Sequence, residues 1–235
     1  MPLPTGSTPV PRNYAAVQDC VVCTLPAAIM KGGIYMREPF FSVIVPAHNA
    51  QEYIRKGLHS IRKQTFTDYE LIVVADACDD DTALIALDYA DKTAIRKYGL
   101  DGLARSEGLN MAAGKYVLFM DDDDWWIHEY AFSMIAERLQ EEPVDELRFG
   151  FIWKGRGYFD QKQQRNIAVW SKAWKREWIG DTRFPDTPYW SDVEFDRLMH
   201  LKDYTQASLD QALYYYNYLR PGSISWRKEK GEIIF

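Results

Sequence analysis

Four consecutive aspartates, Asp121–Asp124, are the strongest chemical feature of this sequence. They follow the apolar run Tyr116–Met120 and precede two tryptophans, Trp125 and Trp126. Carboxylates crowded between a buried strand and large aromatic rings repel one another unless a cation offsets their charge. Mg²⁺ and Mn²⁺ prefer oxygen ligands and usually complete their coordination with substrate phosphates. The run therefore predicts a metal site beside a phosphorylated ligand, rather than a solvated acidic loop.

Two other polar segments also follow strand-like runs. Pro46–Asn49 comes after Phe41–Val45, and Asp76–Asp81 comes after Tyr69–Val74. In open parallel sheets, ligands bind outside the carboxyl ends of the strands. The two segments and the aspartate run are therefore expected to converge on one site.

The elements that must position these segments alternate between strand and helix. We expect strands at Phe41–Val45, Tyr69–Val74, Thr93–Lys97 and Lys115–Met120, and helices at Ala50–Lys63, Thr82–Ala90 and Gly102–Ala113. This alternation predicts right-handed crossovers and a mostly parallel sheet flanked by helices, an α/β fold. Beyond Pro143 the pattern weakens, and we expect strands at Glu146–Trp153 and Leu213–Tyr218 and helices at Trp170–Ile179 and Asp192–His200.

The chain has 235 residues, of which 47% are hydrophobic, enough for a sizeable core. We expect one compact domain at 39–235, with a nucleotide-sugar half at 39–124 and an acceptor half at 125–235. Residues 1–38 are rich in proline and lack a helical or strand period, so we interpret them as an N-terminal extension outside the core. Lys31-Gly-Gly33 shortly before Met36 suggests the hypothesis that Met36 is the natural start. The pair Cys20 and Cys23 has no second pair to complete a zinc site and is interpreted as incidental.

Charge and hydropathy exclude several classes of protein. A formal net charge of −6 gives no electrostatic footprint for nucleic acid. No stretch approaches the roughly 20 apolar residues of a membrane span, and the start of the chain does not resemble a signal peptide. Three cysteines without such a signal indicate a reducing compartment. We therefore expect a cytoplasmic protein, which can touch the membrane surface through a lipid-linked acceptor.

Short motifs occur in order between residue 39 and about residue 225. They are Phe41–Asn49, Ser60–Phe66, Tyr69–Val74, Ala104–Leu109 and Ala113–Asp124, then Val169–Lys172, Lys175-Arg176, Phe184-Pro185, Ser191-Asp192, Tyr215-Tyr216 and Arg220–Ser223. Each is weak alone, but the ordered set resembles the inverting family 2 glycosyltransferases with the Rossmann-like GT-A fold. The resemblance implies transfer of a sugar from a nucleotide-diphosphate donor to a hydroxyl acceptor, with Mn²⁺ or Mg²⁺ as cofactor. It also implies a part in polysaccharide or glycoconjugate synthesis.

The resemblance implies roles for individual residues. Donor contacts would come from Pro46, Ala47, His48, Asn49, Glu52, Asp76, Arg105, Asp121 and Asp122. Asp121 and Asp123 match the outer carboxylates of the metal motif, and Asp123 is the expected direct ligand. Asp192 matches the catalytic base, which would take the proton of the attacking acceptor hydroxyl. Trp170 and Ser191 would contact the acceptor.

The sequence departs from the family pattern at three positions. Ala75 stands where an acid commonly contacts the base, so uracil preference is not implied. Ser191 replaces the acid that often precedes the catalytic base, and His48 replaces a frequent tyrosine and suits either base stacking or packing. Without the resemblance, Asp192 is better explained as an acid at a helix N-terminus, stabilised by the helix dipole. The helical spacing of Trp170, Trp174 and Trp178 favours core packing for most of these rings.

Two other functions remain open on the residues alone. A nucleotidyltransferase shares the sheet and the acidic metal site, but it usually has a Gly-rich basic loop after the first strand. Pro46–Asn49 has neither feature. A non-catalytic sugar- or nucleotide-binding module is supported only by Ala75 and Ser191.

Overall fold

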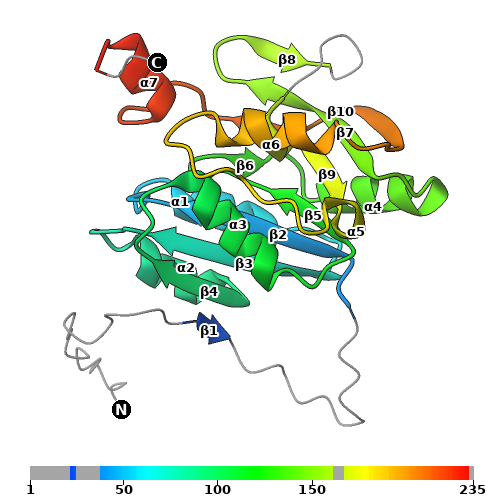
Figure 1. Ribbon diagram of the computed structural model, residues 1–235, viewed down its shortest axis with the longest axis horizontal. Coiled ribbons are helices and arrows are strands. Elements are labelled where there is room, and N and C mark those ends of the chain that lie inside the picture. Colours follow the sequence, from blue (N-terminus) through cyan, green and yellow to red (C-terminus); the bar gives the residue numbers. More distant parts are fainter. Residues whose placement is uncertain (1–21, 25–37, 161–166, 233–235) are drawn as a thin grey trace, which may run out of the picture.

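A ten-stranded sheet runs through the part of the chain that the structure describes, residues 22–24, 38–160 and 167–232 (Figure 1). The structure is a computed structural model. The strand order is β1-β4-β3-β2-β5-β9-β7-β10-β6, and β8 pairs with β7. The strands are β1 (Val22–Thr24), β2 (Phe41–Ala47), β3 (Tyr69–Asp76), β4 (Lys92–Arg96), β5 (Tyr116–Phe119), β6 (Trp125–Trp126), β7 (Glu146–Trp153), β8 (Gly157–Phe159), β9 (Lys172–Lys175) and β10 (Gln206–Tyr216).

The four strands β4, β3, β2 and β5 are parallel neighbours. Every residue of β2 and β5 is buried, as expected for strands covered on both faces. The chain moves from β2 to β3 and β4, and then returns to place β5 on the other side of β2. The carboxyl ends of β2 and β5 therefore form a topological switch point, which is where open α/β sheets bind ligands.

Helices cover both faces of the sheet (Figure 1). α1 (Ile54–Arg62), α2 (Thr82–Tyr89) and α4 (Ala131–Glu141) share one core cluster with the buried side chains of β2 and β3. α3 (Asp101–Met111) and α6 (Ser191–Met199) pack on the other face. The remaining helices are η2 (Val169–Ser171), α5 (Arg176–Ile179) and α7 (Ile224–Glu229). None of the helices in the described ranges has the length and apolar character that crossing a bilayer requires.

The predicted α/β fold with a mostly parallel, helix-flanked sheet is confirmed. One predicted element is wrong: Trp170–Ile179 is not a helix but the short η2, the strand β9 and the short α5. β9 pairs antiparallel with both β5 and β7, and this pairing between distant segments overrides the local helical spacing of the tryptophans. The predicted core packing is confirmed for Trp170 and Trp174, whose side chains are 6% and 0% exposed.

The predicted N-terminal extension contributes one described strand. β1 pairs antiparallel with β4 at the edge of the sheet. Residues 1–21 and 25–37, which include Cys20 and Met36, lie outside the described residues, and so does the hypothesis about the natural start.

Candidate donor and transfer site

The carboxyl ends of β2, β3 and β5 bring the three predicted polar segments together. Ala47 lies opposite Ala75 in the register of β2 and β3, and the acidic run begins one residue after Met120, whose amide donates to the carbonyl of Ile44 over 3.0 Å. The amide of His48 donates to Oδ2 of Asp122 over 3.0 Å. The convergence expected from the sequence is therefore present in the fold.

Asp124 is the structural member of the acidic run. Its side chain is fully buried and accepts hydrogen bonds from the Tyr214 hydroxyl at 2.7 Å and from the Asn217 amide at 2.8 Å. The Tyr214 hydroxyl also accepts from the amide of Asp121 at 3.1 Å. These bonds fix the acidic loop to the end of β10 and leave Asp121, Asp122 and Asp123 facing the partly exposed site.

A glycine allows α1 to approach this loop closely. A Cβ atom on Gly57 would lie 2.6 Å from the carbonyl oxygen of Asp124, inside van der Waals contact. Only glycine therefore fits this crossing of α1 over the acidic loop without a shift of one of them.

Asp122 and Asp123 share a cation within the chain, Arg220. The Arg220 guanidinium forms an ion pair with Asp123 and lies 3.3 Å from Oδ1 of Asp122. It also lies over the ring of Tyr53, 4.8 Å from its centroid. Burial and the neighbouring carboxylates Asp122 and Asp121 raise the pKa of Asp123 to about 7, although Arg220 opposes the shift. The loop thus carries more negative charge than one guanidinium neutralises.

The side chains of the acidic run are chemically suited to Mg²⁺ or Mn²⁺. Asp121, Asp122 and Asp123 offer carboxylate oxygens, the ligands that such ions prefer. Burial raises the pKa of Asp122 and of Asp123, so a cation beside them would favour their ionised forms. Arg220 already provides part of this effect.

Arg105 links the acidic run to α6. This buried side chain donates to Asp121 over 2.7 Å and forms an ion pair with Asp101, one turn earlier in α3. The Ser191 hydroxyl donates to Asp101 over 3.0 Å at the start of α6. Asp192 is the next residue, and its charge interacts with both Arg105 and Asp121. One guanidinium therefore stands among the three carboxylates at the switch point.

The environment of Asp192 suits a proton acceptor. Burial raises the pKa of its carboxyl, Arg105 opposes that shift, and Asp121 adds to it. A carboxylate with a raised pKa is a better general base at neutral pH, provided that it remains ionised. Asp192 also lies in the first turn of α6, where the helix dipole favours its charged form.

The close packing of α3 on α6 holds this arrangement. A Cβ atom on Gly102 would lie 2.8 Å from Cβ of Ser191 and 2.9 Å from the carbonyl oxygen of Pro185. The absent side chain lets Asp101 and Arg105 reach the amino end of α6.

The other residues predicted to bind the donor differ in burial and in hydrogen bonding. Asp76 is buried, and its two carboxylate oxygens accept from the amides of Tyr98 at 2.5 Å and Leu100 at 3.1 Å. It therefore also anchors the loop that leads into α3. The carbonyl of Asp76 lies 2.8 Å from Nδ1 of the exposed His48.

The loop after β2 has one strained position. Asn49 has φ 46°, in the left-handed region, and its side chain accepts from the amide of Asp79 at 2.8 Å. Pro46 and Ala47 are buried, whereas Glu52 is exposed. The loop thus presents His48 and Asn49 to the site and keeps Pro46 and Ala47 in the core.

The two predicted acceptor residues are both buried. Trp170 is 6% exposed and stacks on Tyr214, with ring centroids 4.8 Å apart. Ser191 is 1% exposed, and its hydroxyl is engaged with Asp101. Direct contact with an acceptor stays a prediction for both, and Ser191 has a positioning role in this structure.

Sequence reasoning assigned no role to Arg220, Asp101 or Tyr214. Arg220 is the first residue of the motif Arg220–Ser223. A basic residue in a motif set with several acidic residues could have indicated a partner for the aspartates. Asp101 lies four residues before Arg105, the spacing of an ion pair on a helix. The partnership of Tyr214 with Asp124 spans 90 residues and has no local signal.

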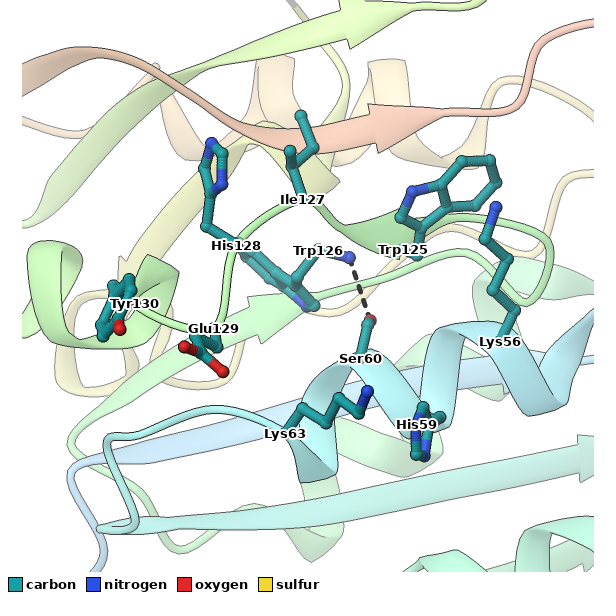
Figure 2. A pocket seen from close by; sticks show the side chains of 10 residues that line it. All are labelled: Lys56, His59, Ser60, Lys63, Trp125, Trp126, Ile127, His128, Glu129 and Tyr130. Carbon is teal, nitrogen blue, oxygen red and sulfur yellow. Dashed lines mark hydrogen bonds between the residues drawn. The ribbon is translucent and has the colours of Figure 1, made fainter.

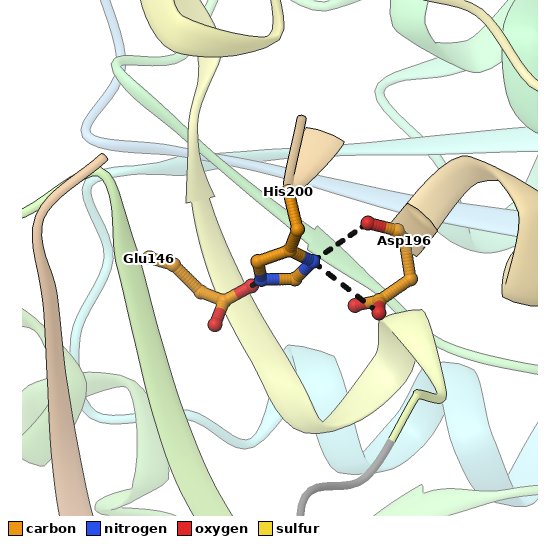
Figure 3. A group of neighbouring side chains, drawn as sticks. All are labelled: Glu146, Asp196 and His200. Atoms are coloured by element: carbon orange, nitrogen blue, oxygen red, sulfur yellow. Dashed lines mark hydrogen bonds and ion pairs between the residues drawn. The ribbon is translucent and has the colours of Figure 1, made fainter. Parts of the chain in front are cut away.

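A second cluster of ionisable groups lies beneath α6 (Figure 3). His200 stands between Glu146 and Asp196, with its ring nitrogens 3.1 and 3.3 Å from their carboxylates. Lys172, which is fully buried, forms an ion pair with Asp196 and lies 3.7 Å from Glu146. Arg148 forms an ion pair with Glu146.

The side chains of this cluster could bind a metal ion, but the negative charge of its two carboxylates is already offset by neighbouring cations. Burial disfavours the charged form of His200, but hydrogen bonds to Asp196 and Glu146 outweigh burial and raise its pKa to about 9. Glu146 and Asp196 therefore already face three cations: His200, Lys172 and Arg148. We interpret the cluster as an ionic anchor for α6.

The fold and the site define a GT-A-type α/β protein. The family model for glycosyl transferase family 2 matches residues 42–205, more than half of the chain, so the chain belongs to that family. The glycosyltransferase GlyA of Streptococcus pneumoniae serotype 4 is 27% identical over 219 residues, which cover 78% of this chain and 31% of GlyA.

Solved structures show the same fold. Staphylococcus aureus TarS in complex with UDP-GlcNAc is similar with a TM-score of 0.71 and 26% identity, over 78% of this chain and 59% of the TarS chain. A mannosyltransferase of Pyrobaculum calidifontis in complex with GDP-Man and Mn²⁺ has a TM-score of 0.64 at 17% identity, over 84% of this chain and 62% of that chain. The chain thus spans less than two thirds of the length of each of these proteins.

Proposed function

We propose that this chain transfers a sugar from a nucleotide-diphosphate donor to a hydroxyl acceptor in glycan synthesis, with inversion at the anomeric carbon. Membership of glycosyl transferase family 2 and the likeness to a TarS structure with UDP-GlcNAc support this proposal. The observation that carries it is the placement of Arg105 among Asp101, Asp121 and Asp192. This arrangement joins a diphosphate and metal site to a candidate base.

Mn²⁺ or Mg²⁺ is the proposed cofactor, held by Asp121 and Asp123. When bound, the ion supplies Lewis-acid stabilisation of the charge that grows on the departing diphosphate. Arg220 now pairs with Asp122 and Asp123 and is free to turn toward the donor phosphates once a stronger cation binds there. Arg105 remains beside Asp121 and can bind a diphosphate oxygen.

The donor's nucleoside is proposed to lie on the loop after β2. His48 and Asn49 are exposed there and can contact the base or the ribose, with Glu52 nearby. Asp76 orients this region through His48 and through the loop before α3.

Asp192 is the proposed general base. It accepts the proton of the acceptor hydroxyl as that oxygen forms its bond to the anomeric carbon and the bond to the diphosphate breaks. Attack from the face opposite the diphosphate inverts the anomeric configuration. Arg105 stabilises the ionised base before the proton arrives.

The acceptor is proposed to be a glycan or another hydroxyl compound, including lipid-linked ones. TarS is named as a poly(ribitol-phosphate) β-N-acetylglucosaminyltransferase, so the acceptor of that relative carries phosphate. We propose a cytoplasmic location with contact to the membrane surface through such an acceptor.

The test is metal-dependent hydrolysis and transfer with a panel of UDP- and GDP-sugars. We expect turnover of at least one donor with Mn²⁺ or Mg²⁺ and loss of turnover with a chelator. Asp123→Asn should lose metal-dependent donor binding, whereas the exposed and distant Asp203→Asn should keep it. Wild-type turnover by Asp123→Asn in the same metal would remove Asp123 from the site.

A further inference from the structure

A pocket of about 470 Å³ lies between α1 and the segment that follows the acidic run (Figure 2). Its walls are Lys56, His59 and Ser60 of α1, Lys63 directly after that helix, and residues 125–130. The pocket lies on the α1 face of the sheet, whereas α6 with Asp192 packs on the opposite face. The pocket is therefore separate from Asp192.

The charge of the pocket is positive in an otherwise acidic protein. Across the described ranges, no carboxylate lies within ion-pair distance of Lys56 or Lys63. Glu129 is the one acid among the lining residues. The two lysines are seven positions apart, one in α1 and one at its C-cap, which corresponds to about 10 Å along the helix axis. The pocket therefore offers two lysines to an anionic ligand.

Lys56 stands where a lysine is unfavourable. It lies in the first turn of α1, where the helix dipole disfavours a positive charge. Burial and the nearby Lys154 lower its pKa. Its ammonium group lies over the ring of Trp125, 2.9 Å from the centroid, and that cation–π contact is its main compensation. Lys63, at the other end of α1, complements the helix dipole, but no such role explains Lys56.

The pocket also contains an unused hydrogen-bond donor. Trp126 is 3% exposed, and its indole nitrogen is buried without a hydrogen-bond partner among the described residues. The backbone amide of Trp126 is satisfied, because it donates to the Ser60 hydroxyl over 3.0 Å. A buried donor without a partner is costly, so an acceptor atom of a ligand would stabilise it.

We propose that this pocket binds a phosphate ester group. A phosphate offers several acceptor oxygens and up to two negative charges, which suit two lysines and an indole N–H. The group could belong to a soluble phosphorylated glycan or to a lipid headgroup, and in both cases the pocket would hold the protein on the molecule or surface that carries its acceptor. That use of the site rests on the proposed function, whereas phosphate binding itself does not.

The test compares two probes, glycerol 3-phosphate and vesicles of phosphatidylcholine with phosphatidylglycerol, by calorimetry and co-sedimentation. We expect saturable binding that the double variant Lys56→Gln/Lys63→Gln weakens at least about tenfold. The matched control is Arg55→Gln/Lys115→Gln, which removes the same charge from exposed positions outside the pocket and should change the dissociation constant less than about twofold.

The probes identify the source of the phosphate. Binding of glycerol 3-phosphate that depends on the two lysines indicates a soluble phosphate ester, and binding of vesicles alone indicates a headgroup in a membrane. No saturable binding of either probe, or an equal loss in the control, would overturn the proposal. Donor hydrolysis should be unchanged in both double variants. If the wild-type protein hydrolysed no donor, that result would contradict the proposed function but not phosphate binding by this pocket.

Discussion

Arg105 connects carboxylates that the sequence keeps far apart. Asp101 lies four residues before it, Asp121 sixteen residues after it, and Asp192 on another helix. Burial disfavours the charged guanidinium, but these three acids outweigh burial and raise its pKa further, so Arg105 remains a fixed cation. A fixed cation lets Asp192 stay ionised in a partly buried place and still accept a proton.

Asp192→Asn is the residue-scale prediction for the transfer step. Asparagine keeps the size of the side chain but cannot take the acceptor's proton, and general-base catalysis contributes about 10²–10⁴-fold. Transfer should fall by about that factor, while donor affinity stays near the wild-type value because the acidic run is intact. The measurements are transfer rate, donor dissociation constant and melting temperature on one variant.

The same variant separates catalysis from helix capping. Asparagine is itself favourable at a helix N-terminus, so a purely structural Asp192 would leave activity and stability close to wild type. Unchanged transfer would move the search for a base to Asp186 or Glu194, of which Glu194 is already paired with Arg197.

At the scale of elements, two helices approach the site through glycines. Gly57 brings α1 against the acidic loop, and Gly102 brings α3 against the start of α6. Because the first contact lies at the proposed metal site and the second at the proposed base, the two glycines should have separable effects on activity.

Gly57→Ala should weaken metal-dependent donor binding. Its Cβ would lie 2.6 Å from the carbonyl oxygen of Asp124, so the acidic loop or α1 must shift. Overpacking of this kind costs about 1–3 kcal/mol, against a gain in helix propensity of about 1 kcal/mol. Donor titration in the presence of Mn²⁺ measures the effect.

Gly102→Ala is the reciprocal control. Its Cβ would press on Ser191 and move the amino end of α6 away from Arg105. The transfer rate should fall more than donor affinity, the reverse of the result for Gly57→Ala. If both variants lost donor affinity and transfer rate in the same proportion, the two helices would not have separate effects on donor binding and on transfer.

Elements were predictable from the sequence where local pattern and tertiary environment agree. The runs Phe41–Val45 and Tyr69–Val74 are apolar and form buried strands. Trp170–Ile179 shows helical spacing, yet its middle is a strand, because β9 fills the space between β5 and β7. α4 was missed, although its buried residues Phe132, Ile135 and Leu139 follow a helical period.

The site was predictable where its residues follow strands directly. The acidic run and the loop after β2 lie at strand ends, so topology brings them together. Arg220 and Tyr214 contact the acidic run from a segment near the carboxyl end of the sequence that is rich in aromatic residues. No local pattern in that segment shows which residue faces the aspartates.

On the scale of the whole molecule, the ionic anchor formed by Glu146, Lys172, Asp196, His200 and Arg148 joins β7, β9 and α6. Asp196 lies in the second turn of α6 and His200 directly follows its last residue, so the anchor fixes the carboxyl end of that helix on the sheet. Its charges therefore couple the stability of the fold to pH.

Stability should fall as the pH rises from about 6.5 through about 9. The folded state raises the pKa of His200 from 6.5 to about 9, so its contribution is fully present below 6.5 and is lost as the folded histidine deprotonates. The slope is up to about 1.4 kcal/mol per pH unit, and each kcal/mol corresponds to about 2–4 °C in melting temperature. Thermal unfolding across this range measures it.

His200→Gln isolates the histidine. Burial lowers the pKa of Lys172, which contributes with the opposite sign at higher pH, so the comparison must be between the variant and wild type. The variant should be less stable near neutral pH and should show a flatter dependence between pH 6.5 and 9. An unchanged slope would assign the pH dependence to other groups.

The bonds from Asp124 to Tyr214 and Asn217 also bear on how the site forms during synthesis. Asn217 emerges from the ribosome 93 residues after Asp124. Until then the most buried aspartate of the acidic loop lacks both of its donors, and a carboxylate is costly to bury unpaired. The parallel strands β2, β3 and β5 can pair while the chain is still being made, but the acidic loop can reach its final form only after β10 has been added. We therefore expect the nascent protein to pass through a stage in which these parallel strands can pair while the acidic loop still lacks its final conformation.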